Sequence, residues 1–185
     1  MKANSARCHK AYYSISSLSE AMNLKTLGWN SSLKSAFREH QEAGLEPARI
    51  VSQDGNRYTA LGEKGEFKGK VSGRMRYECT QSGDLPAVGD WVATEVNTEI
   101  RRMTIHAILP RHSKFARATY NKGNYEGDQV ICANVDFIFI VVGLDEEFNA
   151  NRLERYLAQA SASGSKPVVI LSKSDICRNL TGILK

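Results

Sequence analysis

Two apolar runs decide the fold of the second part of this chain: Asp136-Phe-Ile-Phe-Ile-Val-Val-Gly-Leu144 and Pro167-Val-Val-Ile-Leu171. In each run, apolar side chains would point to both faces of a strand, which is typical of strands buried in a parallel sheet. A parallel pair needs a crossover connection between its strands, and this is usually a helix. The residues between the two runs are therefore expected to be helical.

The connecting segment has the features of an amphipathic helix. Asn149 is a favourable N-cap residue, and Gly164 is a favourable residue just past a helix end. Between them, apolar side chains recur at positions i, i+3, i+4 and i+7: Leu153, Tyr156, Leu157 and Ala160. Strand, helix and strand in this order predict a right-handed βαβ unit, in which ligands bind beyond the carboxyl ends of the strands.

Directly after the second strand, Ser172-Lys173-Ser174-Asp175 resembles the Asn-Lys-x-Asp motif by which GTPases recognise guanine. The carboxylate of Asp175 can accept two hydrogen bonds from the guanine edge, which adenine does not offer. The aliphatic part of Lys173 can cover one face of the base. Ser172 is shorter than the usual Asn. These residue types are also typical of an ordinary turn after a strand, so both interpretations stay open on the motif alone.

A GTPase also needs a phosphate cradle with the pattern Gly-x-x-x-x-Gly-Lys-[Ser/Thr]. The nearest segment is Gly65-Glu-Phe-Lys-Gly69-Lys70-Val71. Lys64 stands where the first glycine belongs, and Val71 where the magnesium-binding hydroxyl belongs. This segment also lies between predicted strands, so we interpret it as a β-turn segment. The chain as printed is predicted not to hydrolyse GTP.

The first part of the chain predicts a small β-barrel behind a short helix at Leu33–Gln41. Asp54-Gly55 is a strong hairpin signal, and Gly69 and Gly73 could bend a strand around a barrel corner. The expected strands are Arg49–Ser52, Arg57–Leu61, Glu66–Ser72, Met75–Cys79, Trp91–Val96 and Met103–Leu109. If Gly69 and Gly73 bend one long strand, these segments make about five strands, which favours an OB-fold, a common nucleic-acid-binding barrel; an SH3-like barrel fits the spacing almost as well. Trp91 is interpreted as a barrel core residue.

The charge is unevenly distributed along the sequence. The net charge is +5, and residues 129–185 carry equal numbers of acidic and basic side chains, so the excess lies in residues 1–128. One stretch within it contains no acidic residue and six basic ones: Arg101, Arg102, Arg111, Lys114, Arg117 and Lys122. Such a stretch can dock on phosphate in a salt-dependent way, and a solvated basic surface is the equal alternative. Tyr120 and Tyr125 in the same region could stack on exposed bases.

The composition is that of an ordinary globular protein, with 42% hydrophobic and 24% charged residues. No apolar run approaches the roughly 20 residues that a membrane span needs. The cysteines Cys8, Cys79, Cys132 and Cys177 are scattered without metal-ligand spacing, so we expect no metal site and free thiols in a cytoplasmic protein.

The predicted organisation has four parts. Residues 1–26 are expected to be a disordered leader, residues 27–109 the barrel with its N-terminal helix, residues 110–128 a basic linker or mobile binding loop, and residues 129–185 the beginning of an α/β domain. One βαβ unit cannot bury both faces of its sheet, so this second domain is expected to be incomplete.

Several segments together resemble the ribosome small-subunit-dependent GTPase A family (RsgA/YjeQ), whose members are circularly permuted GTPases. They occur in the family order from about Leu24 to Cys177. The matching segments are Leu27-Gly-Trp29, Leu85-Pro-Ala-Val-Gly-Asp-Trp-Val92, Arg111-His-Ser-Lys-Phe-Ala-Arg117, Gln129-Val-Ile-Cys-Ala-Asn-Val-Asp136, Phe148-Asn149, Arg152-Leu-Glu-Arg-Tyr-Leu157 and Pro167-Val-Val-Ile-Leu-Ser-Lys-Ser-Asp175.

The resemblance implies an OB-fold that contacts ribosomal RNA, followed by a P-loop GTPase-type α/β domain whose motifs are reordered so that the guanine motif precedes the P-loop. It implies a monomer that uses GTP with Mg²⁺, acts in late maturation of the small ribosomal subunit and carries zinc only in a further C-terminal region. The expected guanine-binding residues are Ser172, Lys173, Ser174 and Asp175, and those for RNA are Arg101, Arg102, Arg111, Lys114, Arg117 and Lys122.

Two alternative functions remain open at the level of sequence. The chain could be a stand-alone OB-type module that binds RNA or the ribosome, with a purely structural βαβ segment and no nucleotide hydrolysis. It could also be an interaction protein that binds a ribosomal protein through its barrel. A salt-insensitive association would favour the interaction protein, because docking on RNA phosphates weakens as salt rises.

Overall fold

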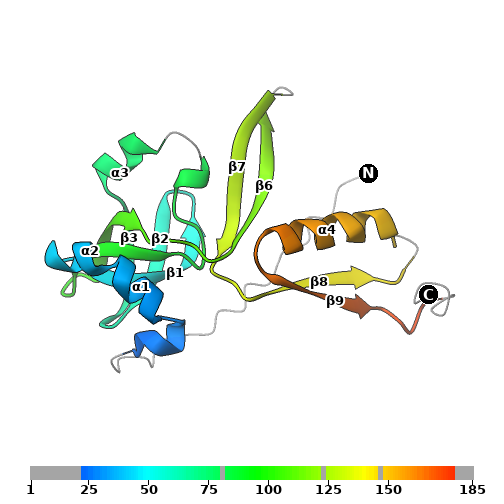
Figure 1. The fold of residues 1–185 in the computed structure, drawn as a ribbon, viewed down its shortest axis with the longest axis horizontal. Coiled ribbons are helices and arrows are strands. Elements are labelled where there is room, and N and C mark those ends of the chain that lie inside the picture. Colours follow the sequence, from blue (N-terminus) through cyan, green and yellow to red (C-terminus); the bar gives the residue numbers. More distant parts are fainter. Residues whose placement is uncertain (1–21, 80–81, 122–123, 146–147, 178–185) are drawn as a thin grey trace.

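The computed structural model describes residues 22–79, 82–121, 124–145 and 148–177. Figure 1 shows a barrel at one end, a projecting hairpin in the middle and a helix-covered strand pair at the other end. The predicted leader falls mostly outside the described residues, but its last part differs from the prediction, because a 3-10 turn begins at Leu24. Asn23 caps this turn by accepting a hydrogen bond from the Lys25 amide.

The barrel closes in the strand order β1-β2-β3-β5-β4, with β4 pairing back onto β1. All its pairs are antiparallel except β3 with β5, which are parallel. The turn between the first two strands contains Gly55 with a φ of 57°, as the Asp-Gly signal predicts. This closed five-stranded, OB-like barrel confirms the expected fold class. Its strands are β1 (Glu46–Asp54), β2 (Arg57–Gly62), β3 (Gly65–Val71), β4 (Trp91–Asn97) and β5 (Arg102–Ile108).

The barrel is well buried, in one cluster inside it and a second beneath the helices that precede it. Phe67 is 1% exposed and packs in a cluster with eight other buried residues, among them Ile50, Val92 and Ile105. The helices α1 (Ser31–Ala36) and α2 (Arg38–Glu42) form where a single helix was predicted. Leu33 of α1 and Phe37, which lies between the two helices, join Trp91 in a second cluster, so Trp91 is a core residue as expected, although it packs against the helices and not in the cluster of Phe67.

The expected strand at Met75–Cys79 is wrong, because Gly73–Glu78 forms the short helix α3. The Ser72 hydroxyl accepts a hydrogen bond from the Met75 amide at 3.1 Å, which is the usual geometry of an N-cap. Met75 is buried against the barrel core, whereas Tyr77 is 90% exposed. The alternation of apolar and polar residues in Met75–Cys79 is compatible with a strand and also with a short helix that buries one residue. The N-cap at Ser72 favours the helix.

Gly69 is required by a close approach between two strands. A Cβ atom at this position would lie 1.8 Å from the Met103 carbonyl oxygen of the parallel neighbour β5. The sequence suggests that Gly69 could bend a strand at a barrel corner. The structure gives a more specific reason, which is that no side chain fits between β3 and β5 here.

The segment predicted as a basic linker or mobile loop is instead a regular hairpin, visible in yellow-green in Figure 1. Its strands are β6 (Lys114–Asn121) and β7 (Asn124–Ala133), so β7 runs through the domain boundary expected at residue 128. The register shifts between Phe115 and Ala116 and again between Thr119 and Tyr120. These shifts interrupt the alternation of side chains, which is why the sequence shows no period of two.

The βαβ unit forms as predicted. The strands β8 (Phe137–Gly143) and β9 (Lys166–Ser172) pair in parallel, and α4 (Ala150–Ala162) connects them. The side chain of Asn149 accepts a hydrogen bond from the Arg152 amide at 3.0 Å. Gly164, just after the helix, has a φ of 86°, which few other residues adopt without strain.

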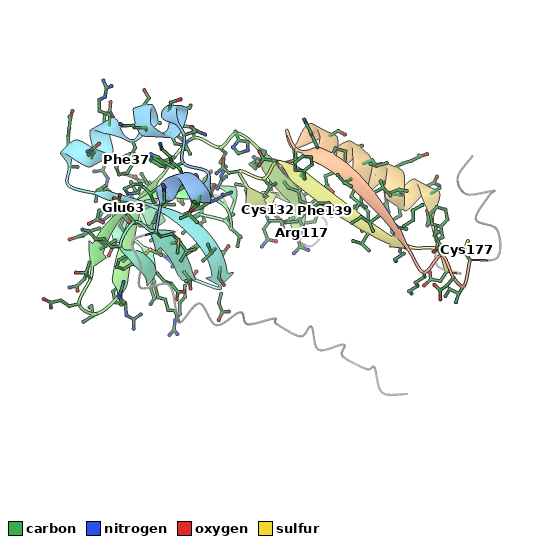
Figure 2. All side chains as sticks on the ribbon, turned by 90° about the horizontal axis from the view of Figure 1, so that it is seen from below. Phe37, Glu63, Arg117, Cys132, Phe139 and Cys177 are labelled. Carbon is green, nitrogen blue, oxygen red and sulfur yellow. The ribbon has the colours of Figure 1, made fainter. Side chains whose placement is uncertain are left out.

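Within the part of the chain that the structure describes, only one face of the β8–β9 pair is covered. Ile140 and Val142 are buried beneath α4, where they contact Ala160. On the other face Phe137, Phe139 and Val141 are between 54% and 65% exposed. Figure 2 shows the labelled Phe139 on β8 in this half of the molecule. The unit therefore has the one-sided burial that its sequence implies.

Candidate functional site

The guanine-like motif begins at the carboxyl end of β9 and is tied to β8. The Ser172 hydroxyl donates to the Val142 carbonyl oxygen at 3.2 Å, and the Leu144 amide donates to the Ser172 carbonyl oxygen at 2.9 Å. In Figure 2 the labelled Cys177, just past this motif, lies at the end of the molecule remote from the barrel residues Phe37 and Glu63. The parallel pairing thus brings the ends of both strands to one edge.

Lys173 has an unusual backbone and a defined side-chain partner. Its φ is 59°, in the left-handed region that non-glycine residues rarely occupy. Its ammonium group forms an ion pair with the carboxylate of Asp145, which follows β8. The lysine side chain reaches Asp145 by passing Gly143 at the end of β8. Gly143 leaves room for it, because a Cβ there would lie 3.3 Å from Asp145 Oδ2 and 3.4 Å from Lys173 Cδ.

The rest of the motif forms an exposed turn. The Ile176 amide donates to the Lys173 carbonyl oxygen at 3.3 Å, and the Cys177 amide to that of Ser174 at 3.4 Å. Ser174 and Asp175 are both exposed. The turn leaves the Asp175 carboxylate accessible to an incoming ligand, while the Ser172 hydroxyl is already occupied by β8.

Five of the six basic residues predicted to bind RNA are described by the structure, and these five lie on different elements instead of in one surface patch. Arg101 and Arg102 lie at the turn into β5 of the barrel, and both are exposed. Lys114 and Arg117 lie on β6 of the hairpin, where Arg117 donates to Gln129 Oε1 at 3.0 and 3.1 Å. Figure 2 labels Arg117 in the middle of the molecule. Lys122 lies outside the described residues.

Arg111 holds the barrel loop instead of facing solvent. Its guanidinium donates to both carboxylate oxygens of Asp90, at 2.7 and 2.8 Å, and to the carbonyl oxygens of Gly83 and Leu85. The Asp90 side chain is fully buried, and that of Arg111 is only 16% exposed. Asp90 also accepts a hydrogen bond from the Ala87 amide at 2.8 Å. This network gives Arg111 a structural role that the charge pattern did not reveal.

Sequence reasoning also missed the junction between the barrel and the hairpin. The Arg49 guanidinium donates to the carbonyl oxygens of Leu27, Gly89 and Asn134, and burial lowers its pKa. The Asn134 side chain donates to Gly89 and accepts from the His112 amide. The sequence did point to Asn134, because it lies in the segment Gln129–Asp136 that resembles the RsgA family. The resemblance gave that segment no structural role, however.

The hairpin also packs against the βαβ unit. The Gln159 side chain of α4 donates to the Ala116 carbonyl oxygen at 2.8 Å, and Phe115 packs against the cluster beneath α4. At the tip of the hairpin, the rings of Tyr120 and Tyr125 meet edge to face at 5.9 Å and both are exposed. A hydrogen bond from the Tyr125 hydroxyl to Asp128 raises the pKa of this tyrosine.

Two further expectations concern metals and membranes. Among the described residues, no group of three or more His, Cys, Asp or Glu side chains is placed to hold a metal ion. Within the same residues, no helix has both the length and the apolar character needed to cross a membrane. The cysteines Cys79, Cys132 and Cys177 are free thiols.

Comparison with known proteins gives consistent relatives. The family model described as "RsgA GTPase" matches residues 108–184. The "Small ribosomal subunit biogenesis GTPase RsgA" of Syntrophotalea carbinolica is 44% identical over 161 residues, which cover 84% of this chain and 44% of that protein. The protein of the same name from Opitutus terrae is 39% identical, again over 84% of this chain and 44% of the relative. The chain thus spans less than half the length of these curated relatives.

Two solved structures share the fold. YjeQ from Thermotoga maritima superposes with a TM-score of 0.56 at 21% identity, over 76% of this chain and 46% of that one. YloQ, described as a circularly permuted GTPase, superposes with a TM-score of 0.51 at 19% identity, over 72% and 42% of the two chains. The barrel, the βαβ unit, the matched segment and the curated relatives agree, and the chain therefore belongs to the RsgA family.

Proposed function

We propose that this chain recognises guanine through Ser172–Asp175 and docks on ribosomal RNA through its basic side chains, as part of a monomeric cytoplasmic GTPase that acts in late maturation of the small ribosomal subunit. One observation carries the proposal: the guanine-like motif lies at the shared carboxyl edge of a parallel strand pair, in a chain that is 44% identical to a protein named as a small-subunit biogenesis GTPase. GTP with Mg²⁺ is the expected cofactor of that activity.

Guanine recognition rests on the exposed carboxylate of Asp175. It can accept hydrogen bonds from the ring N1–H and the exocyclic amine of guanine, whereas adenine presents an acceptor in place of N1–H. Charge-assisted hydrogen bonds of this kind are each worth roughly 1.5–3 kcal/mol. The hydroxyl of Ser172 is bonded to β8 and so supports the turn instead of the base.

RNA docking is assigned to the basic side chains on either side of Arg111 in the sequence; of these, the ones that the structure describes are exposed, and Lys122 is included on its sequence position alone. These are Arg101 and Arg102 on the barrel and Lys114 and Arg117 on the hairpin, together with Lys122. Arg111 contributes indirectly, because its guanidinium is committed to Asp90 and the loop that precedes β4. The exposed rings of Tyr120 and Tyr125 on the same hairpin offer apolar faces on which bases could stack.

The printed sequence contains no Gly-x-x-x-x-Gly-Lys-[Ser/Thr] segment. We therefore expect this chain by itself to bind the guanine base without hydrolysing GTP, since positioning of the phosphates and of Mg²⁺ is what accelerates phosphoryl transfer. Turnover of GTP by the purified chain would contradict this part of the proposal.

Guanine recognition is tested by nuclear magnetic resonance titration of the chain with guanosine and, separately, with adenosine. We expect guanosine to bind more tightly and Asp175→Ala to weaken its binding by about tenfold or more, given the size of charge-assisted hydrogen bonds. Asp54→Ala is the matched control, because Asp54 is an exposed carboxylate in a barrel turn. Equal binding of the two nucleosides would reject guanine recognition and favour the stand-alone RNA-binding module.

RNA docking is tested by measuring affinity for small-subunit ribosomal RNA over a series of salt concentrations. The double variant Lys114→Ala with Arg117→Ala should weaken binding. It should also make the slope of log affinity against log salt concentration less steep by about two, because about two fewer counterions are released. Lys34→Ala with Arg38→Ala, which removes two exposed charges from the helices before the barrel, is the matched control. Equal losses for both pairs would mean that the hairpin has no specific part in docking.

A further inference from the structure

One ion pair at the guanine-like motif takes no part in the proposed contacts of Asp175 with guanine or of the basic side chains with RNA. It joins Lys173, just after β9, to Asp145, just after β8. The two residues are 28 apart in sequence and meet because Gly143 pairs with Ser172 in the parallel register. The pair thus links the carboxyl ends of both strands at the edge where the guanine-like motif lies.

Folding stability alone does not account for this arrangement. The side chains of Lys173 and Asp145 are 55% and 26% exposed, and ion pairs this open to water contribute little to stability. Lys173 also has a left-handed backbone, which is unfavourable for a residue with a long side chain. Unfavourable backbone conformations of this kind are concentrated at ligand sites, where the surrounding structure maintains them.

The geometry fixes the path of the lysine side chain. Its backbone is anchored to β9 and its ammonium to Asp145, so the four-carbon chain crosses the end of β8 beside Gly143. A Cβ at Gly143 would lie within 3.4 Å of both the lysine chain and the Asp145 carboxylate. A lysine chain held at both ends presents its methylene groups as an ordered apolar surface, whereas a free one would sample many rotamers.

We propose that Asp145 is a positioning residue for guanine recognition: it holds the Lys173 ammonium so that the methylene chain lies ready to cover one face of the base, while Asp175 binds the base edge. The proposal rests on the proposed guanine recognition by this motif. Because the lysine chain is ordered before the base arrives, less rotamer freedom is lost on binding. Gly143 is part of the same device, since it provides the space in which the two side chains meet.

The test is a titration of the 185-residue chain with guanosine, followed by nuclear magnetic resonance, for the wild type and five variants. Asp145→Asn is expected to weaken guanosine binding three- to tenfold, and Lys173→Met to weaken it by a similar or larger factor. The double variant should bind like Lys173→Met alone, because Asp145 acts only through the lysine. A purely structural role would instead give independent, multiplicative losses.

Asp136→Asn is the matched control. Asp136 is an exposed carboxylate just before β8, whereas Asp145 lies just after it, so this variant makes the same chemical change at the opposite end of the strand and should bind guanosine like the wild type. The thermal midpoint of Asp145→Asn should stay close to that of the wild type, because the ion pair is exposed.

The outcomes separate the two proposals. If the wild type does not distinguish guanosine from adenosine, guanine recognition itself fails. If it does distinguish them and Asp145→Asn binds guanosine unchanged, the positioning role of Asp145 is wrong while guanine recognition stands. Tighter binding by Asp145→Asn would show that Asp145 competes with the base for Lys173, which also overturns the proposal.

Gly143→Ala gives an independent check that leaves both charges in place. The added methyl group would contact the Asp145 carboxylate and the lysine chain at 3.3–3.4 Å and displace them from each other. We expect a loss of guanosine affinity similar to that of Asp145→Asn. An unchanged affinity would mean that the lysine chain need not cross at Gly143, and the proposed geometry would then be incorrect.

Discussion

The barrel and the βαβ unit differ in how completely their strands are buried. In the barrel every strand has two neighbours, and residues such as Phe67 and Ile105 are almost completely buried. In the βαβ unit, β8 and β9 pair only with each other among the described residues, and α4 covers one face. Phe139 on the other face is 63% exposed. The barrel is therefore complete as a folding unit, whereas the βαβ unit has apolar surface left over.

The difference matters for where a ligand can bind. A closed barrel offers its outer surface and its loops, which suits contact with an extended polyanion such as RNA. A parallel strand pair offers the edge at which its carboxyl ends meet, which suits a small ligand. Guanine recognition is thus proposed at the strand edge, and RNA docking on the barrel together with the adjoining hairpin β6–β7.

The first prediction compares one residue type in the two regions. Phe67→Ala should lower the free energy of unfolding by about 4 kcal/mol, because it removes a buried ring from a closed core. Phe139→Ala should change it by less than about 0.5 kcal/mol, because the ring is already mostly in water. Trp29 and Trp91 are in contact beside the barrel, so urea unfolding followed by tryptophan fluorescence reports on the barrel directly.

Phe139 should in turn be examined by amide hydrogen exchange of β8 and β9, which contain no tryptophan. If Phe139→Ala lowered the free energy of unfolding as much as Phe67→Ala does, the exposed face of the βαβ unit would have to be covered in solution. The contrast between the two regions would then be incorrect.

The second prediction compares two carboxylates that pair with basic residues. Asp90→Asn should lower the free energy of unfolding by about 3 kcal/mol, because it leaves the Arg111 guanidinium largely buried without a counter-charge. Asp145→Asn should lower it by less than about 1 kcal/mol, since its pair is exposed. Urea unfolding of both variants measures the difference. Similar small effects would imply that water reaches the Asp90–Arg111 pair.

Much of the fold could be predicted from local sequence. The strands β8 and β9 follow from apolar runs, and α4 follows from its spacing with Asn149 and Gly164 at its ends. The hairpin at Asp54–Arg57 follows from the positive φ that Gly55 supplies. In each case the decisive interactions lie within a few residues, so the sequence pattern carries them.

What could not be predicted depends on contacts between distant residues. The interaction of Arg49 with Asn134 spans 85 residues, and that of Arg111 with Asp90 spans 21. A charge pattern cannot distinguish an arginine that faces solvent from one that holds a loop. The hairpin β6–β7 was missed for a related reason, because its two register shifts hide the alternation that marks a strand.

The third and smallest prediction compares two helices with side-chain caps, one in each region. Ser72 caps α3 on the barrel and Asn149 caps α4, each through one hydrogen bond to a backbone amide, at 3.1 and 3.0 Å. Replacing either by Ala should cost about 1 kcal/mol. The losses should appear in different places, because α3 is joined to the barrel core through Met75, whereas α4 rests on a strand pair that is open on its other face.

Hydrogen exchange of the amides separates these cases. Ser72→Ala should accelerate exchange evenly across the barrel strands, as expected when a cap contributes to a single cooperative unit. Asn149→Ala should accelerate exchange in α4 and in β8–β9 while leaving the barrel unchanged. If Asn149→Ala also accelerated exchange in the barrel, the junction at Arg49 and Asn134 would have to transmit the loss, and the two regions would unfold together.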